Sequence, residues 1–204
     1  KYFIESEEVY KPKLHDPSRI REEVFAAGET WPKRIKDIFS VISDSGCRIS
    51  EPLELTAWDW WEGSGFEDVI RAPNKQSNGT RVKDLLLKPA TVEAITRSFD
   101  GSGKGRSRRP TMDQLRKFAT ISTPQLALER ILLFPRPDGK PFTDWTLRNT
   151  YFVKAIEKAE ILIDDGNGTM VPPTPHILRH ARIDEEVRKL DGLYPDQERF
   201  LAGL

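Results

Sequence analysis

The chain alternates between apolar stretches with helical spacing and short polar breaks rich in glycine and proline. Apolar residues three or four positions apart predict helices over residues 18–27, 31–43, 89–99, 112–134 and 143–160. Ser18 is predicted to cap the first helix and Gly28 to end it, because a hydroxyl satisfies free N–H groups and glycine closes helices. Pro124 is expected to break the range 112–134 into one or two helices.

Two runs rich in apolar and β-branched residues, 66–73 and 80–87, are typical of the strands of a hairpin. The polar tip between them contains Asn78-Gly79, a strong signal for a tight turn. Three aromatic residues before the hairpin are interpreted as covering the core or the sheet, rather than as a platform for stacking bases: Trp58, Trp60 and Trp61. The pattern as a whole predicts a mostly α chain with a small antiparallel β-sheet, an α+β fold.

The stretch 175–190 begins Pro-His-Ile-Leu-Arg-His and continues with the spacing of an amphipathic helix. Thr174 is expected as its N-cap, with proline at the first helical position. His176 and Arg179 are three residues apart and share a face of this helix, with His180 beside them. Because free N–H groups and the helix dipole already favour an anion at a helix N-terminus, the simplest ligand is a phosphate.

Two other positions carry candidate chemistry. Arg48 follows an Asp-Ser-Gly break and lies at a turn among apolar residues, where it is expected to be partly buried and to need a partner. Glu51, three residues later, could orient it; the alternative is an ordinary ion pair on a helix surface. Lys75 lies near the hairpin tip, free to reach into a groove or an active site, although a lysine in such a turn is usually only solvated. Cys47 is interpreted as a small core residue.

Composition limits the class of protein. With 204 residues, 37% hydrophobic and 31% charged, we expect one large domain (18–204) preceded by an arm or linker (1–17). No long apolar run or signal peptide is visible, so we expect a cytoplasmic protein with no membrane partner. The single Cys47 excludes an internal disulfide, and three histidines without zinc-site spacing argue against a catalytic metal. The glycines at 101–105 do not form a phosphate-binding P-loop, and no cofactor is predicted.

The formal net charge is zero, but the charge is unevenly distributed. Residues 71–109 contain ten Lys or Arg against three acids. Such segregation is expected if one face meets a polyanion; the alternative is a solvated basic surface. The candidate DNA-contacting residues in this stretch are Arg71, Lys75, Arg81, Lys83, Lys104, Arg106, Arg108 and Arg109.

Taken in order, the turn with Arg48, the lysine-bearing hairpin and the His176–Arg179 box resemble the catalytic domain of the tyrosine recombinase (phage integrase) family. The resemblance runs from near Ser18 to the chain end and includes the turn at 135–141 with its following helix. It implies four catalytic residues and two supporting ones: Arg48, Lys75, His176 and Arg179, with Glu51 and His180.

The resemblance also implies a function. Tyrosine recombinases carry out site-specific recombination and integration of mobile DNA, cleaving and religating strands through a 3′-phosphotyrosyl intermediate without a metal. Two guanidiniums would neutralise the non-bridging oxygens of the phosphate. Lys75 would protonate the departing 5′-oxygen, and His176 would act as an acid or base, or donate a hydrogen bond to the phosphate. The implied partner is double-stranded DNA, with self-assembly on DNA in the full-length protein.

The sequence departs from the family pattern after the second box. In the family a His or Trp and then the nucleophilic Tyr follow at a greater distance than this chain allows. Tyr194 is the only tyrosine after Arg179 and is expected to be structural. The catalytic domain is therefore expected to be incomplete, with its nucleophile beyond Leu204, and the fragment inactive. The alternatives are a recombinase-like DNA-binding module that does not cleave, and a helical phosphate-binding or interaction domain with chance motif matches.

Overall fold

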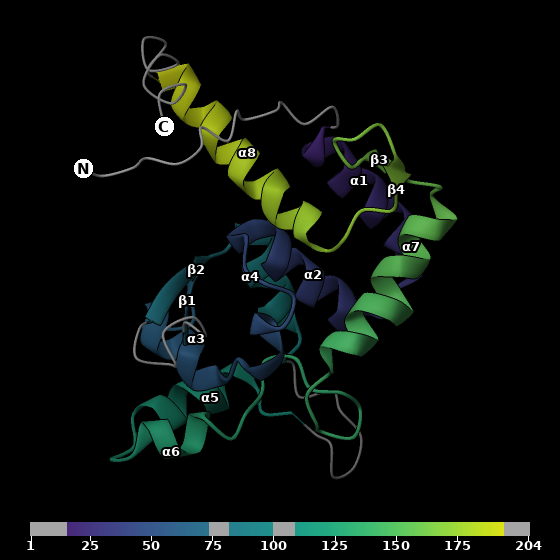
Figure 1. Ribbon diagram of the computed structural model, residues 1–204. Coiled ribbons are helices and arrows are strands. Elements are labelled where there is room, and N and C mark those ends of the chain that lie inside the picture. The colour runs from purple at the N-terminus through teal and green to yellow at the C-terminus, as the bar shows by residue number, and fades with distance from the viewer. Residues whose placement is uncertain (1–15, 74–81, 100–108, 194–204) are drawn as a thin grey trace, which may run out of the picture.

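The computed structural model describes residues 16–73, 82–99 and 109–193 (Figure 1). The α-helices, in chain order, are α1 (Pro17–Ala27), α2 (Lys33–Ser45), α3 (Ala57–Ser64), α4 (Pro89–Arg97), α5 (Met112–Ala119), α6 (Pro124–Leu128), α7 (Val153–Lys158) and α8 (His176–Leu193). The remaining elements are the 3₁₀ turns η1 (Gly28–Thr30) and η2 (Glu51–Glu54), the π-helix η5 (Thr146–Phe152), and the strands β1 (Val69–Pro73), β2 (Val82–Leu86), β3 (Ile163–Asp164) and β4 (Met170–Val171).

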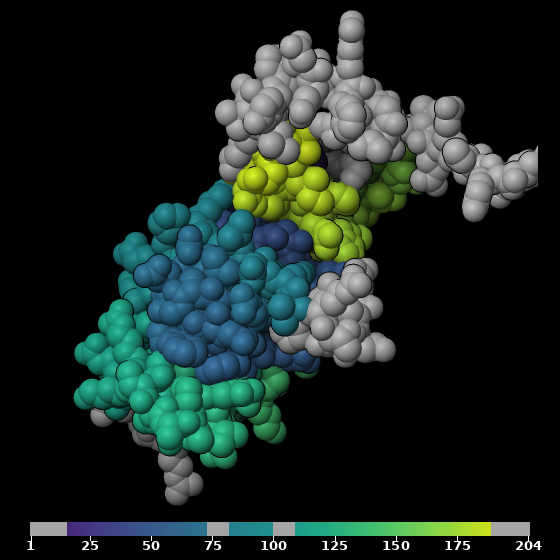
Figure 2. Space-filling model, turned by 90° about the vertical axis from the view of Figure 1, so that its left-hand side faces the viewer, coloured from purple at the N-terminus to yellow at the C-terminus, as the bar shows by residue number. Residues whose placement is uncertain are grey.

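Helix α8 forms one end of the molecule and packs across α1 and α2 (Figure 1). Viewed from the side, α8 lies in yellow above the blue surface of α3 and the β1–β2 hairpin, with α5 and α6 in green at the other end (Figure 2). Helix α2 lies between these parts and contacts α8, α4, β2 and η2. The chain is thus arranged around α2, whose two ends face different parts of the surface.

The sequence of α2 explains its central position. Ile35, Ile38, Phe39 and Ile42 repeat at helical spacing and are at most 1% exposed. The helix ends at Gly46, whose φ of 62° is left-handed and whose N–H donates to the carbonyl oxygen of Ile42 at 3.0 Å. The prediction of this helix is confirmed, shifted by two residues at each end.

The predicted cap of α1 is wrong. Asp16, not Ser18, occupies the N-cap, and its carboxylate accepts a hydrogen bond from the Ser18 N–H at 3.0 Å. Pro17 is the first helical residue, a position that suits proline because its φ is already helical and it has no N–H to satisfy. The cap must therefore precede Pro17. Gly28 does end the helix, as predicted.

The predicted hairpin is confirmed. β1 and β2 are antiparallel, with Val69 opposite Leu86 and Pro73 opposite Val82. The tip of the hairpin lies outside the described residues. Trp60 of α3, which precedes the hairpin in the chain, is fully buried. Its indole N–H donates to the carbonyl oxygen of Glu67 at 2.7 Å. Trp58 and Trp61 pack against the same core, as their interpretation required.

The range 143–160, predicted as one amphipathic helix, contains the π-helix η5 before α7. The physical reason lies in its apolar spacing. Leu147 and Phe152 are both fully buried and are five residues apart, which matches the i, i+5 repeat of a π-helix and not the α-helical repeat. Two short elements were not predicted: α3, which begins with a capping box made by Thr56 and Asp59, and the β3–β4 ladder.

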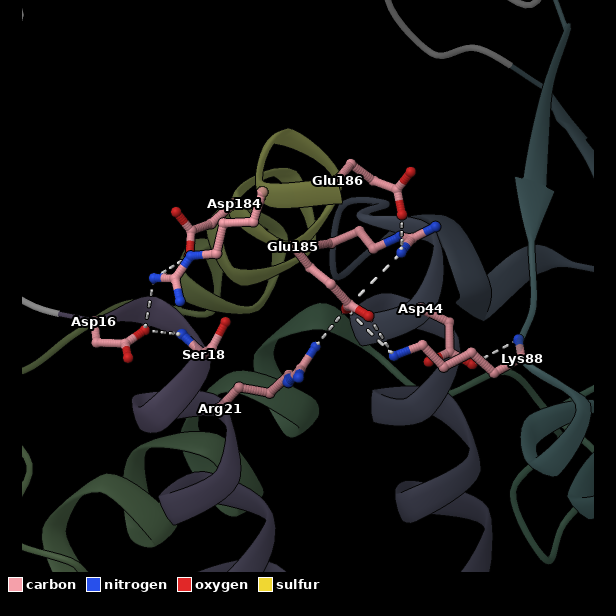
Figure 3. Close-up of polar contacts among 10 residues, drawn as sticks. Asp16, Ser18, Arg21, Asp44, Lys88, Asp184, Glu185 and Glu186 are labelled. Carbon is pink, nitrogen blue, oxygen red and sulfur yellow. Dashed lines mark hydrogen bonds and ion pairs between the residues drawn. The ribbon is translucent and has the colours of Figure 1, made fainter. Parts of the chain in front are cut away.

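A network of charges fastens α8 to the rest of the molecule (Figure 3). Glu185 of α8 accepts hydrogen bonds from Arg21 of α1 at 3.1 Å and from the Lys88 ammonium at 3.2 Å. The backbone N–H of Lys88 in turn donates to Asp44 of α2 at 3.0 Å. Partial burial alone would raise the pKa of Glu185, but the hydrogen bonds from Arg21 and Lys88 outweigh it and lower the pKa to about 2.

We expect Glu185→Gln to reduce the free energy of unfolding by about 1 kcal/mol at pH 7, because it removes partly exposed ion pairs with Arg21, Lys88 and Arg182. The carboxylate stabilises the fold above its unfolded pKa, near 4.5, and this contribution disappears as the pH falls toward 2. The difference in unfolding free energy between wild type and variant, measured by urea unfolding, should therefore shrink from pH 7 to pH 3 without vanishing. The control is Glu186→Gln, whose ion pair with Arg182 lies within α8. A loss for Glu186→Gln equal to that for Glu185→Gln would contradict the interpretation.

Candidate functional site

Three segments that are distant in the sequence enclose a hollow of about 190 Å³. They are the turn after α2, the start of the helical segment that contains η5, and the start of α8. The hollow is lined by Arg48, Ser50, Asp144, Arg148 and His176, together with Cys47, Ile49 and Pro175. We refer to it as the Arg48 hollow. Its three basic side chains make it a candidate site for an anion.

Arg179 lies beside this hollow, although it is not among the lining residues. Gly46 lies next to α8: a Cβ at this position would be in ordinary van der Waals contact, 3.5 Å from Cγ of Arg182 and 3.8 Å from Cγ of Arg179. Gly46 is only two residues from Arg48. The turn with Arg48 and the first turns of α8 therefore adjoin, and His176 is exposed where they meet.

Glu51 fixes the Arg48 turn through the backbone. Its carboxylate accepts a hydrogen bond from the N–H of Arg48 at 2.6 Å and forms an ion pair with the Lys83 ammonium at 2.5 Å. The Glu51 side chain is only 4% exposed, so its charge needs a partner, and Lys83 of β2 provides one. Glu51 thus orients the main chain that carries Arg48 and ties it to the hairpin.

Sequence reasoning did not identify the partnership of Lys83. It placed Lys83 among the DNA-contacting residues, whereas in the structure its ammonium is paired with a buried carboxylate. The signal was available in β2, where alternate side chains face inward: Leu85 is buried, and Lys83 lies on the same face, while Val82 and Leu86 are exposed. The identity of its partner, 32 positions earlier, could not be read from that alternation.

Arg148 and Asp144 were also missed. They form a long ion pair of 3.6 Å, one turn apart, at the start of the helical segment that follows the turn at 135–141. One oxygen of Asp144, Oδ1, is buried and accepts no hydrogen bond among the described residues. The pairing is therefore loose, and the Arg148 guanidinium remains available to a ligand in the hollow. Only the three-dimensional fold brings these residues to His176.

Cys47 is a core residue, as interpreted. It is 2% exposed, and burial raises the pKa of its thiol to about 12. A thiol with this pKa is protonated at neutral pH and is a poor nucleophile. The hollow therefore offers guanidinium and imidazole chemistry rather than cysteine chemistry.

The other predicted site residues are distributed as follows. Arg71 pairs with Asp84 across the hairpin, at an exposed position. Arg109 donates to the carbonyl oxygens of Leu133 and Leu132, so its guanidinium lies against the core. His180 is exposed on the first turns of α8, and its supporting role stays a prediction. Several candidates lie outside the described residues: Lys75, Arg81, Lys104, Arg106, Arg108 and Tyr194.

Clusters of metal ligands and membrane-spanning helices are both absent from the described part of the chain. Residues 16–73, 82–99 and 109–193 contain no group of three or more His, Cys, Asp or Glu that could hold a metal ion. None of the helices within these ranges combines the length and the apolar character needed to cross a membrane.

The fold is similar to those of known recombinases. No family model and no curated protein matches the sequence. Among solved structures, XerA recombinase is similar with a TM-score of 0.51 at 18% identity, over 88% of this chain and 53% of that one. The lambda integrase catalytic core is similar with a TM-score of 0.51 at 13% identity, over 81% of this chain and 78% of that one. The chain thus spans about half the length of XerA recombinase.

These similarities show the fold. The chain has the α+β fold of a tyrosine-recombinase catalytic domain, which confirms the fold predicted from its ordered motifs. The identities are too low to carry over the role of any single residue, so the roles of the residues around the Arg48 hollow have to be argued from their own chemistry.

The Glu51–Lys83 pair gives a test of how the Arg48 turn is held. We expect Lys83→Met to reduce the free energy of unfolding by about 2 kcal/mol or more, because it leaves a buried carboxylate without its counter-charge. Arg71→Met is the matched control, since it removes an exposed cation from the same hairpin and should cost within about 0.5 kcal/mol. Chemical denaturation measures both. Equal losses would show that the carboxylate does not depend on Lys83.

Proposed function

We propose that this chain, whose fold is that of a tyrosine-recombinase catalytic domain, acts in DNA recombination by holding a phosphodiester of duplex DNA in the Arg48 hollow. The observation that carries the proposal is the meeting of Arg48, Arg148 and His176 in one hollow, with Arg179 beside it. These groups come from three separate segments. Such a convergence of guanidinium and imidazole groups is suited to a ligand with several negatively charged oxygens.

The chemistry of phosphodiester cleavage suits these residue types. Guanidiniums carry a permanent charge and donate paired hydrogen bonds, so Arg48 and Arg179 can neutralise the two non-bridging oxygens as charge develops on them. His176 is exposed at the first turn of α8, where the free N–H groups of an 18-residue helix also favour an anion. Its imidazole can donate or accept a proton at the phosphate.

Arg148 is proposed as an additional phosphate contact. Its present partner is Asp144 at 3.6 Å, a long and partly exposed ion pair that contributes little on its own. A phosphate in the hollow would offer the guanidinium a closer partner with paired oxygens. Asp144, which lines the same hollow, would keep its ion pair with the guanidinium and so orient it.

In the proposed reaction a tyrosine hydroxyl passes its proton to the His176 imidazole and attacks the phosphorus, the bond to the 5′-oxygen breaks, and the 5′-oxygen takes a proton from Lys75. The protein–DNA bond that forms is a 3′-phosphotyrosine, which a 5′-hydroxyl can attack in reverse to religate the strand. Tyr151 is the one tyrosine within the described ranges, and it packs against the core, so we assign the nucleophile to a tyrosine outside these ranges. Self-assembly on DNA belongs to the same proposal.

DNA binding tests the first part. We expect Arg148→Ala to weaken binding of a short duplex about tenfold and to lower the slope of log affinity against log salt by about one, the effect of losing one phosphate contact. Arg116→Ala is the control, because Arg116 lies on α5, is exposed and pairs with Asp113. Fluorescence anisotropy across a salt series measures both. Equal effects for the two variants would contradict a specific role for the hollow.

Cleavage tests the second part. A nicked suicide substrate traps a covalent adduct when a tyrosine attacks, and the adduct is visible on a denaturing gel. The arms are the chain as it stands, Tyr194→Phe, and a chain extended by the residues encoded after Leu204. In whichever form reacts, Arg179→Ala should slow cleavage by roughly a hundredfold, the usual loss of one transition-state donor. Duplex binding without an adduct in any arm would favour a DNA-binding module that does not cleave.

A further inference from the structure

A second basic hollow lies at the other end of α2. It has a volume of about 290 Å³, and four arginines from four separate segments line it: Arg34, Arg109, Arg130 and Arg136. Arg34 is on α2, Arg109 precedes α5, Arg130 follows α6, and Arg136 lies in the turn at 135–141. We refer to it as the four-arginine pocket. Its position and composition are not explained by the proposed reaction.

The pocket is separate from the Arg48 hollow. The two share no lining residue. Arg34 lies in the first turn of α2, and Arg48 follows the last residue of the helix by three positions. At 1.5 Å per residue their backbones are roughly 20 Å apart along the helix axis. One phosphate cannot occupy both sites.

Two of the arginines are fixed in place by neutral groups. Arg109 donates to the carbonyl oxygens of Leu133 and Leu132 at 3.0 and 3.1 Å, and its guanidinium carbon lies 3.8 Å from the ring centre of Phe99. Arg34 donates to the carbonyl oxygen of Pro135 at 2.5 Å. Carbonyl oxygens accept hydrogen bonds but carry no net charge. The hydrogen bond to Pro135 therefore fixes Arg34 without neutralising its charge.

The wall of the pocket is anchored to the core. The N–H of Leu133 donates to the carbonyl oxygen of Leu55 at 2.8 Å, and the N–H of Ala57 donates to that of Ile131 at the same distance. Arg130 directly precedes this anchored segment and is exposed. The turn that carries Arg136 is closed by a hydrogen bond from the Arg136 N–H to the carbonyl oxygen of Lys140 at 2.7 Å. The pocket is thus formed before any ligand binds.

Few acids oppose this charge. None of the described residues that line the pocket is acidic. Asp138 pairs with Arg136 at 3.2 Å, with both side chains 45% exposed. Asp37 of α2 is buried, and burial raises its pKa to about 6, against the opposing effect of nearby cations that include Arg109 and Arg34. A carboxyl with this pKa is still mostly ionised at pH 7, so Asp37 and Asp138 offset part of the charge of the four arginines, which outnumber them.

We propose that the four-arginine pocket binds a phosphate group. Guanidiniums are the preferred partners of phosphate oxygens, since they donate two parallel hydrogen bonds and remain charged at any physiological pH. Two sources share this chemistry: a backbone phosphate of nucleic acid, and a free phosphorylated ligand. The proposal does not depend on cleavage at the Arg48 hollow, because it rests on other residues and another surface.

The test uses the full chain and the variant Arg130→Glu, which reverses one charge at an exposed position and is expected to fold. Arg116→Glu on α5 is the matched control, with the same change of charge at an exposed arginine. The probes are pyrophosphate, followed by calorimetry, and a 20-base-pair duplex, followed by anisotropy. The pyrophosphate titration is done with Arg48→Ala present in every protein, so that the Arg48 hollow contributes little.

A backbone phosphate as the ligand predicts that Arg130→Glu weakens duplex binding at least tenfold relative to Arg116→Glu, with a smaller salt slope. A free ligand predicts that Arg130→Glu abolishes pyrophosphate binding and leaves duplex binding equal to that of the control. Either result supports the pocket. If Arg130→Glu and Arg116→Glu behave alike with both probes, the proposal is wrong. The comparison of Arg130→Glu with Arg116→Glu remains valid even if Arg48→Ala alone abolishes duplex binding. The proposals for the two sites can therefore be disproved independently.

Discussion

The buried carboxylate of Glu51 is the constraint on which the Arg48 hollow depends. A charge that is 4% exposed has lost most of its water, and this cost is offset only if other groups replace the lost hydrogen bonds. Here the replacements come from two places at once, the N–H of Arg48 and the ammonium of Lys83. One side chain thereby fixes the conformation of the turn and the position of the hairpin beside it. Glu51 and Lys83, rather than the Arg48 side chain itself, therefore hold the turn in place.

In α8, too, the residues that position the element differ from those at the hollow. His176 and Arg179 lie in its first turns, but the helix is fastened farther along, where Glu185 meets Arg21 and Lys88. At the near end, Gly46 lies beside the side-chain stems of Arg182 and Arg179 of α8. The groups that position the helix are thus different from the groups that could bind phosphate. This separation allows basic residues at the hollow to remain available while the helix that carries them is rigid.

Sequence reasoning succeeded where the signal was local or ordered along the chain. Periodicity was sufficient for α2 and for the hairpin, and the left-handed Gly46 follows from the break before Arg48. The fold followed from the order of three motifs, none of which is specific alone. Reasoning failed where the deciding partner is remote: Lys83 turns inward toward an acid on another segment, and Arg148 meets His176 only after folding. The four-arginine pocket was missed for the same reason, since its members are scattered from residue 34 to residue 136.

The number of residues in the π-helix η5 determines the direction of Arg148 relative to α7. A π-turn contains one residue more than an α-turn needs, and each α-helical residue turns the chain by about 100°. The flanking residues are anchored, since Leu147 and Phe152 are buried in the core. Loss of one residue among 149–151 would restore α-helical spacing between Leu147 and Phe152 and rotate Arg148 relative to α7 by about that angle. The presence of Arg148 in the hollow is therefore a property of spacing as much as of residue identity. Homologous chains one residue shorter here would keep the arginine and present it to a different surface.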